Sequence, residues 1–270
     1  MQQKVVIITG ASSGIGKALA YEYSSKGYAV VLAARNEIKL KEIHDKLQSK
    51  ESASLVVKTD VSIEDDCKNM IQQTIEKFGQ IDILVNNAGL SMRASFKDVD
   101  LDVLKKLMDV NFWGTVYSTK YALPYLLKTK GSVVGVLSIA GFLGLPARSG
   151  YSASKYAMRG FLDTLRVENL KTGLHVLVAA PGYTASNIRN TALTEHGQAQ
   201  GESPRNEEKM MSSEEVAKRI AKAVDRKKAE LILTFTEGKF SVFLKKFFPR
   251  LLDKLTYFYI SKEPNSPFVK

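Results

Sequence analysis

Seven short runs of mostly apolar residues recur along this chain, and longer segments with helical patterns separate them. The runs occupy residues 5–8, 29–34, 54–59, 81–85, 132–138, 174–180 and 230–234. A continuous apolar run is typical of a strand that is buried on both faces. Strands that alternate with helices of ten or more residues predict a parallel sheet with helices on both faces. We therefore expect an α/β fold, with one domain over residues 1–235 and a C-terminal amphipathic extension of it over residues 236–270.

A glycine-rich turn follows the first apolar run directly and precedes the first helix. Its residues are Gly10, Ser12, Ser13, Gly14, Ile15 and Gly16. Such a turn lets the backbone approach a pyrophosphate, which then lies at the N-terminus of the helix. An ordinary tight turn is the alternative. In this strand–turn–helix position the motif predicts a dinucleotide site, and the fold becomes a doubly wound, Rossmann-type sheet of about seven parallel strands.

Further cofactor contacts are expected where other strands end, because ligands of a doubly wound sheet bind at the carboxyl edge. The second run leads to Arg35, where an NAD-binding chain would carry an acid for the ribose hydroxyl. An arginine can pair with a 2′-phosphate, so we expect NADP(H) to be preferred over NAD(H). The alternative is a solvated arginine. The loops after the third and fourth runs supply Asp60, Val61, Asn87, Ala88 and Gly89.

Tyr151 and Lys155 lie four residues apart in a helix predicted to extend to about residue 172. This spacing places both side chains on one helix face. An ammonium group near a phenol lowers the pKa of the phenol, so the pair can serve as a general acid/base. On spacing alone, an ordinary surface pair is the more frequent explanation. The catalytic interpretation gains support because Ser138 ends the fifth run at the same edge of the sheet.

Four other segments carry local predictions. Residues 62–65 have the pattern of a capping box that opens a helix through about residue 78. Residues 101–128 are predicted to form one long helix that contains Asn111. Residues 212–215 are expected to cap a helix that ends near residue 226. The polar segment 183–211 has no clear period, and a loop of this length after the sixth strand should cover the substrate side of the site.

Composition excludes some classes of protein. Cys67 is the single cysteine, so no intrachain disulfide can form, which fits a reducing compartment. We find neither a signal-peptide pattern nor an apolar run of ~18 residues, and therefore expect a cytoplasmic protein, peripheral on a membrane at most. The net charge of +11 favours solubility first, and attraction to anionic lipid or an acidic carrier second. Only charge supports a nucleic-acid role, and the three histidines lack metal-ligand spacing, so we expect neither partner.

Six motifs, in the order of the chain, resemble those of the short-chain dehydrogenase/reductase family. They are Thr9-Gly10-(x)3-Gly14-Ile15-Gly16, Asn86-Asn87-Ala88-Gly89, Asn111, Ser138, Tyr151-(x)3-Lys155 and Pro181-Gly182. The match spans residues 4 to about 234. Within the family the chain looks most like the branch of hydroxysteroid-dehydrogenase-like and membrane-associated reductases, which includes the dehydrogenase/reductase member 7B type.

The resemblance implies a role for each matched residue and a homodimer or homotetramer. Tyr151 would exchange a proton with the substrate oxygen, and Ser138 would hydrogen-bond the substrate carbonyl. Lys155 would lower the pKa of Tyr151 and bind the nicotinamide ribose, while Asn111 would hold a water that links Lys155 to solvent. Donors aimed at the oxygen stabilise the charge that hydride transfer leaves there, and the cofactor carries the hydride.

The chain departs from the family pattern at several positions. Leu137 stands where many members have a second serine, so Ser138 is the only hydroxyl at that strand end. After Pro181 and Gly182, either Thr184 or Ser186 could hold the nicotinamide carboxamide. Ser13 occupies a turn position where some NADPH-dependent members carry a basic residue. The NADP(H) prediction therefore depends mainly on Arg35.

The C-terminal extension has apolar residues at helical spacing and basic residues largely on the other side. The apolar positions are Phe240, Leu244, Phe247, Leu251, Leu255 and Phe258. A basic amphipathic helix of this kind suits a membrane surface, which we expect residues 239–260 to contact. Core packing, a subunit interface and a lid over an apolar substrate are the alternatives. Pro249 should kink the helix.

Taken together, the sequence predicts an NADP(H)-dependent oxidoreductase that interconverts an apolar ketone or aldehyde and its alcohol. Reduction of a 3-oxoacyl group on an acidic carrier protein is the alternative substrate. A catalytically silent dinucleotide sensor or scaffold is the alternative of another class, which the complete set of Asn111, Ser138, Tyr151 and Lys155 disfavours. No Gly-x-Ser-x-Gly motif surrounds Ser138, which disfavours a hydrolase.

Overall fold

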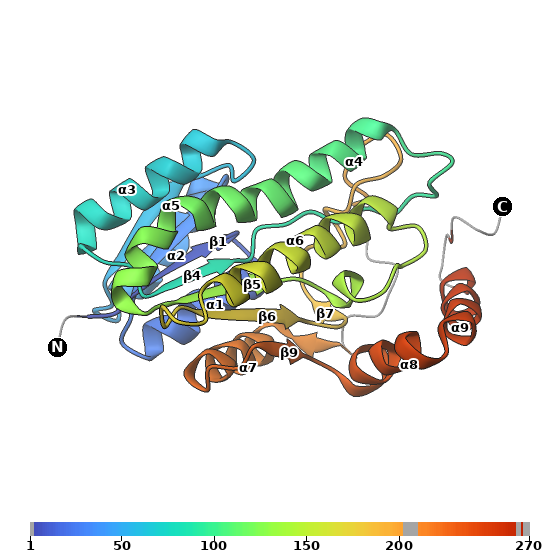
Figure 1. The fold of residues 1–270 in the computed structure, drawn as a ribbon. Coiled ribbons are helices and arrows are strands. Elements are labelled where there is room, and N and C mark those ends of the chain that lie inside the picture. The colour runs from blue at the N-terminus through green and yellow to red at the C-terminus, as the bar shows by residue number, and fades with distance from the viewer. Residues whose placement is uncertain (1–2, 202–209, 263–265, 267–270) are drawn as a thin grey trace.

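Seven parallel strands form the central sheet of the protein in a computed structural model (Figure 1). The structure describes residues 3–201, 210–262 and 266. In spatial order the strands are β3 (Ser54–Lys58), β2 (Ala29–Ala34), β1 (Val5–Thr9), β4 (Ile83–Asn86), β5 (Ser132–Val136), β6 (His175–Ala180) and β9 (Glu230–Ile232). Every neighbouring pair is parallel. The predicted doubly wound sheet is confirmed, although several strands are one to a few residues shorter than expected.

Helices cover both faces of the sheet, as predicted (Figure 1). One face carries α1 (Gly14–Ser25), α2 (Glu37–Gln48) and α7 (Ser213–Asp225), and the other carries α3 (Glu64–Phe78), α5 (Gly114–Thr129) and α6 (Ser149–Glu168). Strand β1 shows why its sequence is continuously apolar. Val6 and Ile8 belong to the core beneath the first group of helices, whereas Val5 and Ile7 belong to the core beneath the second.

The strand order reverses beside β1, which pairs with β2 on one side and with β4 on the other. The chain therefore builds the sheet outward from β1 in one direction and then returns to build it in the other. At such a switch point the loops that leave two neighbouring strands diverge and open a crevice at the carboxyl edge. The glycine-rich turn after β1 and the loop after β4 border this crevice.

The long helix predicted for residues 101–128 is interrupted. It consists of α4 (Leu101–Leu107), a π-helical segment over Met108–Trp113, and α5. A π-helical turn inserts an extra residue and is frequent near functional sites. Asn111 lies inside this segment. The periodicity of apolar residues could not reveal the insertion, because it changes the phase of the helix by only one residue.

The capping prediction was correct for one helix and wrong for another. Ser212 accepts a hydrogen bond from the Glu215 backbone nitrogen at 3.1 Å and caps α7. Helix α3 instead begins after Ile63 without a side-chain cap. The Ser62 hydroxyl donates to the Asp60 carboxylate at 2.7 Å, so a nearby acceptor draws this serine away from the helix.

The segment after β6 is more ordered than its composition suggests. Residues 184–185 form β7 (Thr184–Ala185), which pairs in parallel with β8 (Met211–Ser212). Further along, the Leu193 backbone pairs with Ser91 and Arg93. These contacts tie the segment to the loop after β4 and place it over the carboxyl edge of the sheet. Residues 202–209 of the predicted covering loop lie outside the described residues.

Two helices follow β9 and extend beyond the edge of the sheet (Figure 1). They are α8 (Ser241–Phe247) and α9 (Pro249–Ser261). The helix is interrupted between them at Phe248, next to Pro249, where a kink was predicted. Leu244 and Leu252 are buried and join the main hydrophobic core. Leu244 of the predicted apolar stripe is therefore part of the core, which favours the alternative of core packing for this residue. In the described residues, no helix is long and apolar enough to cross a membrane.

Candidate active site

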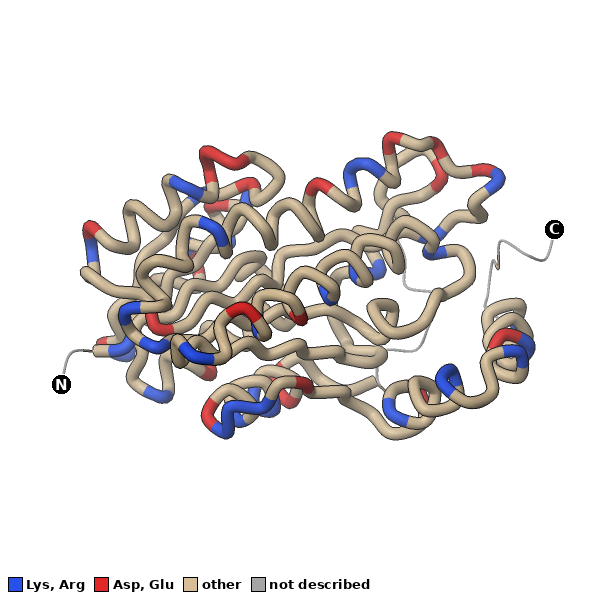
Figure 2. The backbone as a smooth tube through the Cα atoms, viewed as in Figure 1, with Lys and Arg blue, Asp and Glu red and all other residues tan. Residues whose placement is uncertain are grey.

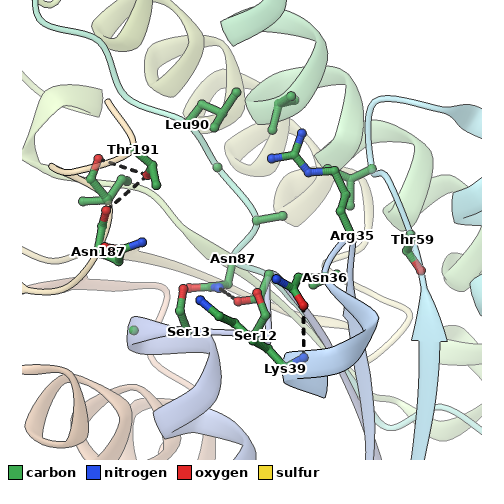
Figure 3. A pocket seen from close by; sticks show the side chains of 18 of the residues that line it. Ser12, Ser13, Arg35, Asn36, Lys39, Thr59, Asn87, Leu90, Asn187 and Thr191 are labelled. Carbon is green, nitrogen blue, oxygen red and sulfur yellow. Dashed lines mark hydrogen bonds between the residues drawn. The ribbon is translucent and has the colours of Figure 1, made fainter. Parts of the chain in front are cut away.

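A cavity of about 750 Å³ lies at the switch point, between the glycine-rich turn and the loops after β2, β3 and β4 (Figure 3). Twelve predicted cofactor contacts line it: Gly10, Ser12, Ser13, Gly14, Ile15, Arg35, Asp60, Val61, Asn87, Ala88, Gly89 and Ser186. Ser186 comes from the segment after β6. The fold thus brings together residues that are far apart in sequence.

Close contacts between two loops explain the glycines of the turn. Gly10 has a φ of +66°, and a Cβ there would lie 2.8 Å from the Ala88 Cα atom. A Cβ on Gly16 would overlap the Gly10 carbonyl oxygen, so Gly16 packs behind the turn and does not line the cavity. The Asn87 side chain donates to the Thr9 carbonyl at 2.9 Å. These contacts hold the turn flat against the loop after β4.

The N-terminus of α1 is suited to an anion. Ser13 occupies the N-cap position but makes no side-chain cap hydrogen bond, and the first turn of α1 contains no acidic residue. Backbone N–H groups at a helix N-terminus favour a phosphate electrostatically. The turn, its glycines and the adjoining cavity fit the pyrophosphate of a dinucleotide, and the residues that would hold it are those of the turn.

Positive side chains also line this cavity. Arg35, Lys39 and Lys58 line it, and Arg35 follows β2 as predicted. The Arg35 Nη1 atom lies 3.9 Å from the Asp60 Oδ2 atom, while the Asp60 Oδ1 atom accepts from Ser62. Figure 3 shows Arg35, Asn36 and Lys39 on neighbouring parts of the wall. Sequence reasoning found Arg35 but missed both lysines, because neither belongs to a motif.

A second cavity of about 130 Å³ adjoins the first. Predicted residues that line it include Ser138, Tyr151, Lys155, Pro181, Gly182, Thr184 and Ser186. The two cavities share Ile15, Asn87, Gly89, Ser186 and Ile188 in their walls. A molecule that extends from the first cavity past Ser186 would therefore reach the tyrosine.

Tyr151 is almost fully buried in the wall of the second cavity. Burial raises the pKa of its hydroxyl, while a hydrogen bond with Ser138 and the charge of Arg148 act in the opposite direction. The Ser138 Oγ atom also accepts from the Ala140 backbone nitrogen at 3.2 Å, which fixes the serine at the strand end. Two hydroxyl groups thus meet at one point of the cavity.

Lys155 is buried beside this pair. Its Nζ atom donates to the Val136 carbonyl at 3.1 Å and lies 5.9 Å from the centre of the Tyr151 ring. Burial dominates the pKa of Tyr151, and its net shift is upward. Burial also lowers the pKa of Lys155 to about 7. Helical spacing could not predict this lowered pKa, because the spacing does not show how deeply a side chain is buried.

Asn111 lies behind the cavities and joins two elements. Its Oδ1 atom accepts from the Leu90 backbone nitrogen at 2.8 Å, and its Nδ2 atom donates to the Leu90 carbonyl at 2.9 Å and to Ser154 Oγ at 2.8 Å. A Cβ on Gly89 would lie 3.1 Å from Asn111 Oδ1 and 3.5 Å from Lys155 Nζ. Asn111 thus connects the loop after β4 to α6 near Lys155.

The two candidates for the nicotinamide carboxamide, Thr184 and Ser186, both line the second cavity. Thr184 is buried, and its hydroxyl donates to the Gly182 carbonyl at 3.2 Å. Ser186 lines both cavities, whereas Thr184 lines only the second. Pro181 accepts from the Ile139 backbone nitrogen at 3.3 Å and so keeps this segment against the end of β5.

Two buried arginines in the second cavity were missed by sequence reasoning. Arg148 and Arg189 both line it. Arg189 donates to the Thr184 carbonyl at 2.7 Å and so helps to hold the segment after β6. The only signal for Arg148 was its position three residues before Tyr151. Within the described residues, no group of three or more histidine, cysteine, aspartate or glutamate side chains could hold a metal ion.

This arrangement of a dinucleotide crevice beside a buried serine and tyrosine defines an oxidoreductase of the Rossmann class. The sequence model described as short chain dehydrogenase matches residues 4–197, which is more than half of the chain. The protein belongs to the short chain dehydrogenase family.

Curated relatives support this membership. The chain is 34% identical over 273 residues to dehydrogenase/reductase SDR family member 7B of Rattus norvegicus, covering 98% of this chain and 84% of that protein. It is 44% identical over 192 residues to 11-beta-hydroxysteroid dehydrogenase-like 4A of Arabidopsis thaliana, covering 70% of this chain. The chain spans 64% of the length of that relative and 53% of the length of 11-beta-hydroxysteroid dehydrogenase 1A of the same plant.

Solved structures share the fold. An alcohol dehydrogenase from the archaeon Thermococcus sibiricus, complexed with 5-hydroxy-NADP, matches with a TM-score of 0.74 at 25% identity, over 85% of this chain and 94% of that chain. A short chain dehydrogenase/reductase from Burkholderia phymatum, in complex with NAD, matches with a TM-score of 0.76 at 25% identity, over 85% and 88% of the two chains. One of these two structures thus holds NAD and the other a hydroxylated form of NADP.

Proposed function

We propose that this chain is an NADP(H)-dependent oxidoreductase that interconverts a carbonyl compound and its alcohol, with Tyr151 as the general acid/base. The observation that carries this proposal is the meeting of the Ser138 and Tyr151 hydroxyls in a buried cavity that shares a wall with the dinucleotide crevice. A carbonyl group at this point could accept hydrogen bonds from both hydroxyls while its carbon faces the shared wall.

The chain supplies proton transfer and orientation. When bound, the nicotinamide cofactor supplies or accepts the hydride. Because burial raises the pKa of Tyr151, its hydroxyl keeps its proton at neutral pH and can donate it to the oxygen of a carbonyl that is being reduced. Ser138 would donate a second hydrogen bond to the same oxygen and stabilise the charge that develops there. In the reverse direction Tyr151 would accept the proton of the alcohol.

The preference for NADP(H) rests on the charged side chains that line the first cavity. Arg35, Lys39 and Lys58 supply three cations there, against the acidic side chains of Glu37 and Asp60. An arginine and two lysines favour a 2′-phosphate over a ribose hydroxyl, because charged hydrogen bonds to phosphate are stronger.

The proposed activity can be tested with a panel of aldehydes, ketones and secondary alcohols. We expect at least one carbonyl compound to accelerate the loss of NADPH absorbance, and the matching alcohol to reduce NADP⁺. NADH should support the same reaction less well. If no carbonyl compound or alcohol of the panel changes either cofactor, while both cofactors bind, the chain would be a dinucleotide-binding protein without this activity.

We also propose that α8 and α9 rest on a membrane surface. Phe243, Phe247, Phe248, Leu251 and Phe258 are each about half exposed. Lys and Arg side chains accompany them along both helices, with Asp253 as an acidic exception (Figure 2). Exposed aromatic residues with cations at their margin suit the interface of an anionic bilayer.

Self-association, as a homodimer or homotetramer, is a further proposal. Trp113 is 43% exposed and stacks on Tyr117 with ring centroids 5.6 Å apart. An exposed indole at the start of α5 is the kind of group that a contact between copies would bury. Light scattering after size-exclusion chromatography would give the mass of the particle, and a monomer would contradict this proposal.

A further inference from the structure

Arg148 occupies a fixed position at the entrance to α6, three residues before Tyr151. Its backbone nitrogen donates to the Leu145 carbonyl at 3.1 Å, and its carbonyl accepts from the Ser152 nitrogen at 2.8 Å. Ala147, just before it, has a φ of +59°, so the chain turns sharply here. This backbone directs the Arg148 side chain into the wall of the second cavity, beside Tyr151.

The Arg148 side chain is buried, and one of its nitrogen atoms lacks a hydrogen-bond acceptor. The residue is only 8% exposed. Its Nη1 atom is buried and has no hydrogen-bond acceptor among residues 3–201, 210–262 and 266. A buried donor that lacks an acceptor costs free energy, and a buried unpaired charge costs more. Proteins retain such groups where a ligand completes them.

The surroundings of Arg148 do not neutralise its charge. Among the described residues that line the second cavity, no aspartate or glutamate is present, and the other cations are Lys155 and Arg189. Arg189 already donates to the Thr184 carbonyl. The cavity around the reacting position is therefore basic on one side. Leu145, Ile188 and Ala192 supply apolar wall on other sides.

We propose that Arg148 binds a carboxylate of the substrate, so that this site takes carbonyl compounds and alcohols that carry an acidic group close to the reacting carbon. This inference rests on the proposed function, and it refines the apolar substrate that the sequence predicted. A guanidinium presents paired N–H donors that match the two oxygens of a carboxylate. The apolar wall would accommodate the rest of the molecule.

The size of the cavity limits the distance between the two functional points. Arg148 and Tyr151 both line the second cavity, whose volume is about 130 Å³. One small molecule in this cavity could therefore contact both the guanidinium and the phenol. We expect the carboxylate and the carbonyl of a good substrate to be separated by only a few bonds.

The inference is tested with pairs of oxo acids and their methyl esters, which differ only in charge. We use 2-oxopentanoate, 4-oxopentanoate and 5-oxohexanoate, each beside its ester, with NADPH as reductant. For the best acid, the wild-type protein should show a kcat/KM at least about tenfold above that of the ester, mainly through KM. Arg148→Gln should remove this preference, mainly by raising the KM of the acid, so that the acid and its ester react with similar kcat/KM. Arg148→Lys should restore part of it, because lysine keeps the charge without the paired donors.

Controls separate this inference from the proposed function. Arg226→Gln, at the exposed end of α7 and outside both cavities, should not change the preference. An unchanged affinity for NADPH shows that Arg148→Gln is folded. If esters and acids react equally well in the wild type and in both Arg148 variants, the role of Arg148 is wrong while the proposed oxidoreductase stands.

A binding measurement covers the case in which none of these compounds is turned over. Benzoate and benzamide, titrated into the complex with NADP⁺ by calorimetry, differ in the charge that Arg148 would bind. We expect benzoate to bind more tightly than benzamide, and this difference to disappear in Arg148→Gln. Equal binding of the two probes to the wild-type protein would overturn the inference.

Discussion

The Nζ atom of Lys155 lies 5.9 Å from the centre of the Tyr151 ring, and both side chains are buried. Burial shifts the two groups in opposite senses, raising the pKa of Tyr151 and lowering the pKa of Lys155 to about 7. Each group thus tends toward its neutral form in the folded protein. A site that needs both residues therefore carries a cost in stability that a purely structural site would avoid.

This cost predicts that Lys155→Met stabilises the protein while abolishing its activity. Between pH 7 and the ordinary lysine pKa of 10.5, the unfolded chain holds a proton that folded Lys155 releases. Stability of the wild type should therefore rise with pH across this window, and the full cost should apply below about pH 7. In urea melts without cofactor, Lys155→Met should gain on the order of a few kcal/mol at pH 6 and much less near pH 10.

Lys171→Met, at an exposed position after α6, is the matched control and should show no such pH-dependent gain. Loss of the hydrogen bond to the Val136 carbonyl will offset part of the gain at Lys155, by about 1 kcal/mol. A Lys155→Met variant that is less stable than the wild type at pH 6 would show that the burial of this ammonium is compensated elsewhere.

Reversal of the charge at Arg35 should change the choice of nucleotide. In Arg35→Asp, a carboxylate would repel a 2′-phosphate and accept hydrogen bonds from a ribose hydroxyl. We expect the ratio of dissociation constants for NADH and NADPH to move toward NADH by roughly tenfold or more. Fluorescence titration of both nucleotides measures it, with Arg226→Asp as the control. An unchanged ratio would exclude Arg35 as a determinant of the preference.

Two glycines inside helices should respond to alanine in opposite ways. A Cβ on Gly16, in α1, would overlap the Gly10 carbonyl, whereas a Cβ on Gly160, in α6, would meet nothing within 4 Å. Gly160→Ala should stabilise the protein by about 0.5–1 kcal/mol, because alanine favours a helix interior. Gly16→Ala should weaken NADPH binding at least about tenfold and lower the melting temperature. Equal behaviour of the two variants would contradict the tight packing of the turn.

Membrane contact by α8 and α9 should be lost when their exposed aromatic residues are replaced, even though both helices remain in the chain. We expect Phe243→Ser, Phe247→Ser and Phe258→Ser, combined in one chain, to abolish sedimentation with vesicles of phosphatidylcholine and phosphatidylserine. Phe96→Ser, at an equally exposed phenylalanine outside the two helices, should leave it unchanged. Truncation after Gly238 is a poorer experiment, because Leu244 and Leu252 belong to the core. Failure of the wild type to sediment with these vesicles would refute membrane contact.

The sheet was predictable because its strands are buried on both faces, and a strand such as β1 must then be apolar throughout. The parallel topology also predicted that Arg35, Ser138 and the glycine-rich turn lie at the same edge of the sheet. The face of the C-terminal helices was predicted only in part. Helical spacing grouped Leu244 with Phe247. In the structure Leu244 is buried against the core, whereas Phe247 is about half exposed.

Two features of the site could not be predicted, since they depend on depth and on local irregularity. The π-helical segment around Asn111 inserts a residue that no apolar period reveals. Arg148 resembles any basic residue in a surface loop until the fold buries its side chain. The pKa of Tyr151 moves upward for the same reason, because a sequence gives the neighbours of a group along the chain but not its exposure to water.

The central claim is that Tyr151 transfers the proton in a nicotinamide-dependent reaction, and one measurement tests it most directly. Using the best carbonyl compound of the panel, the rate of NADPH consumption is compared between the wild type and Tyr151→Phe, together with the NADPH dissociation constant of each. We predict a loss of at least about a hundredfold in rate with an NADPH affinity unchanged within about twofold. A Tyr151→Phe variant that retains the wild-type rate would contradict the account.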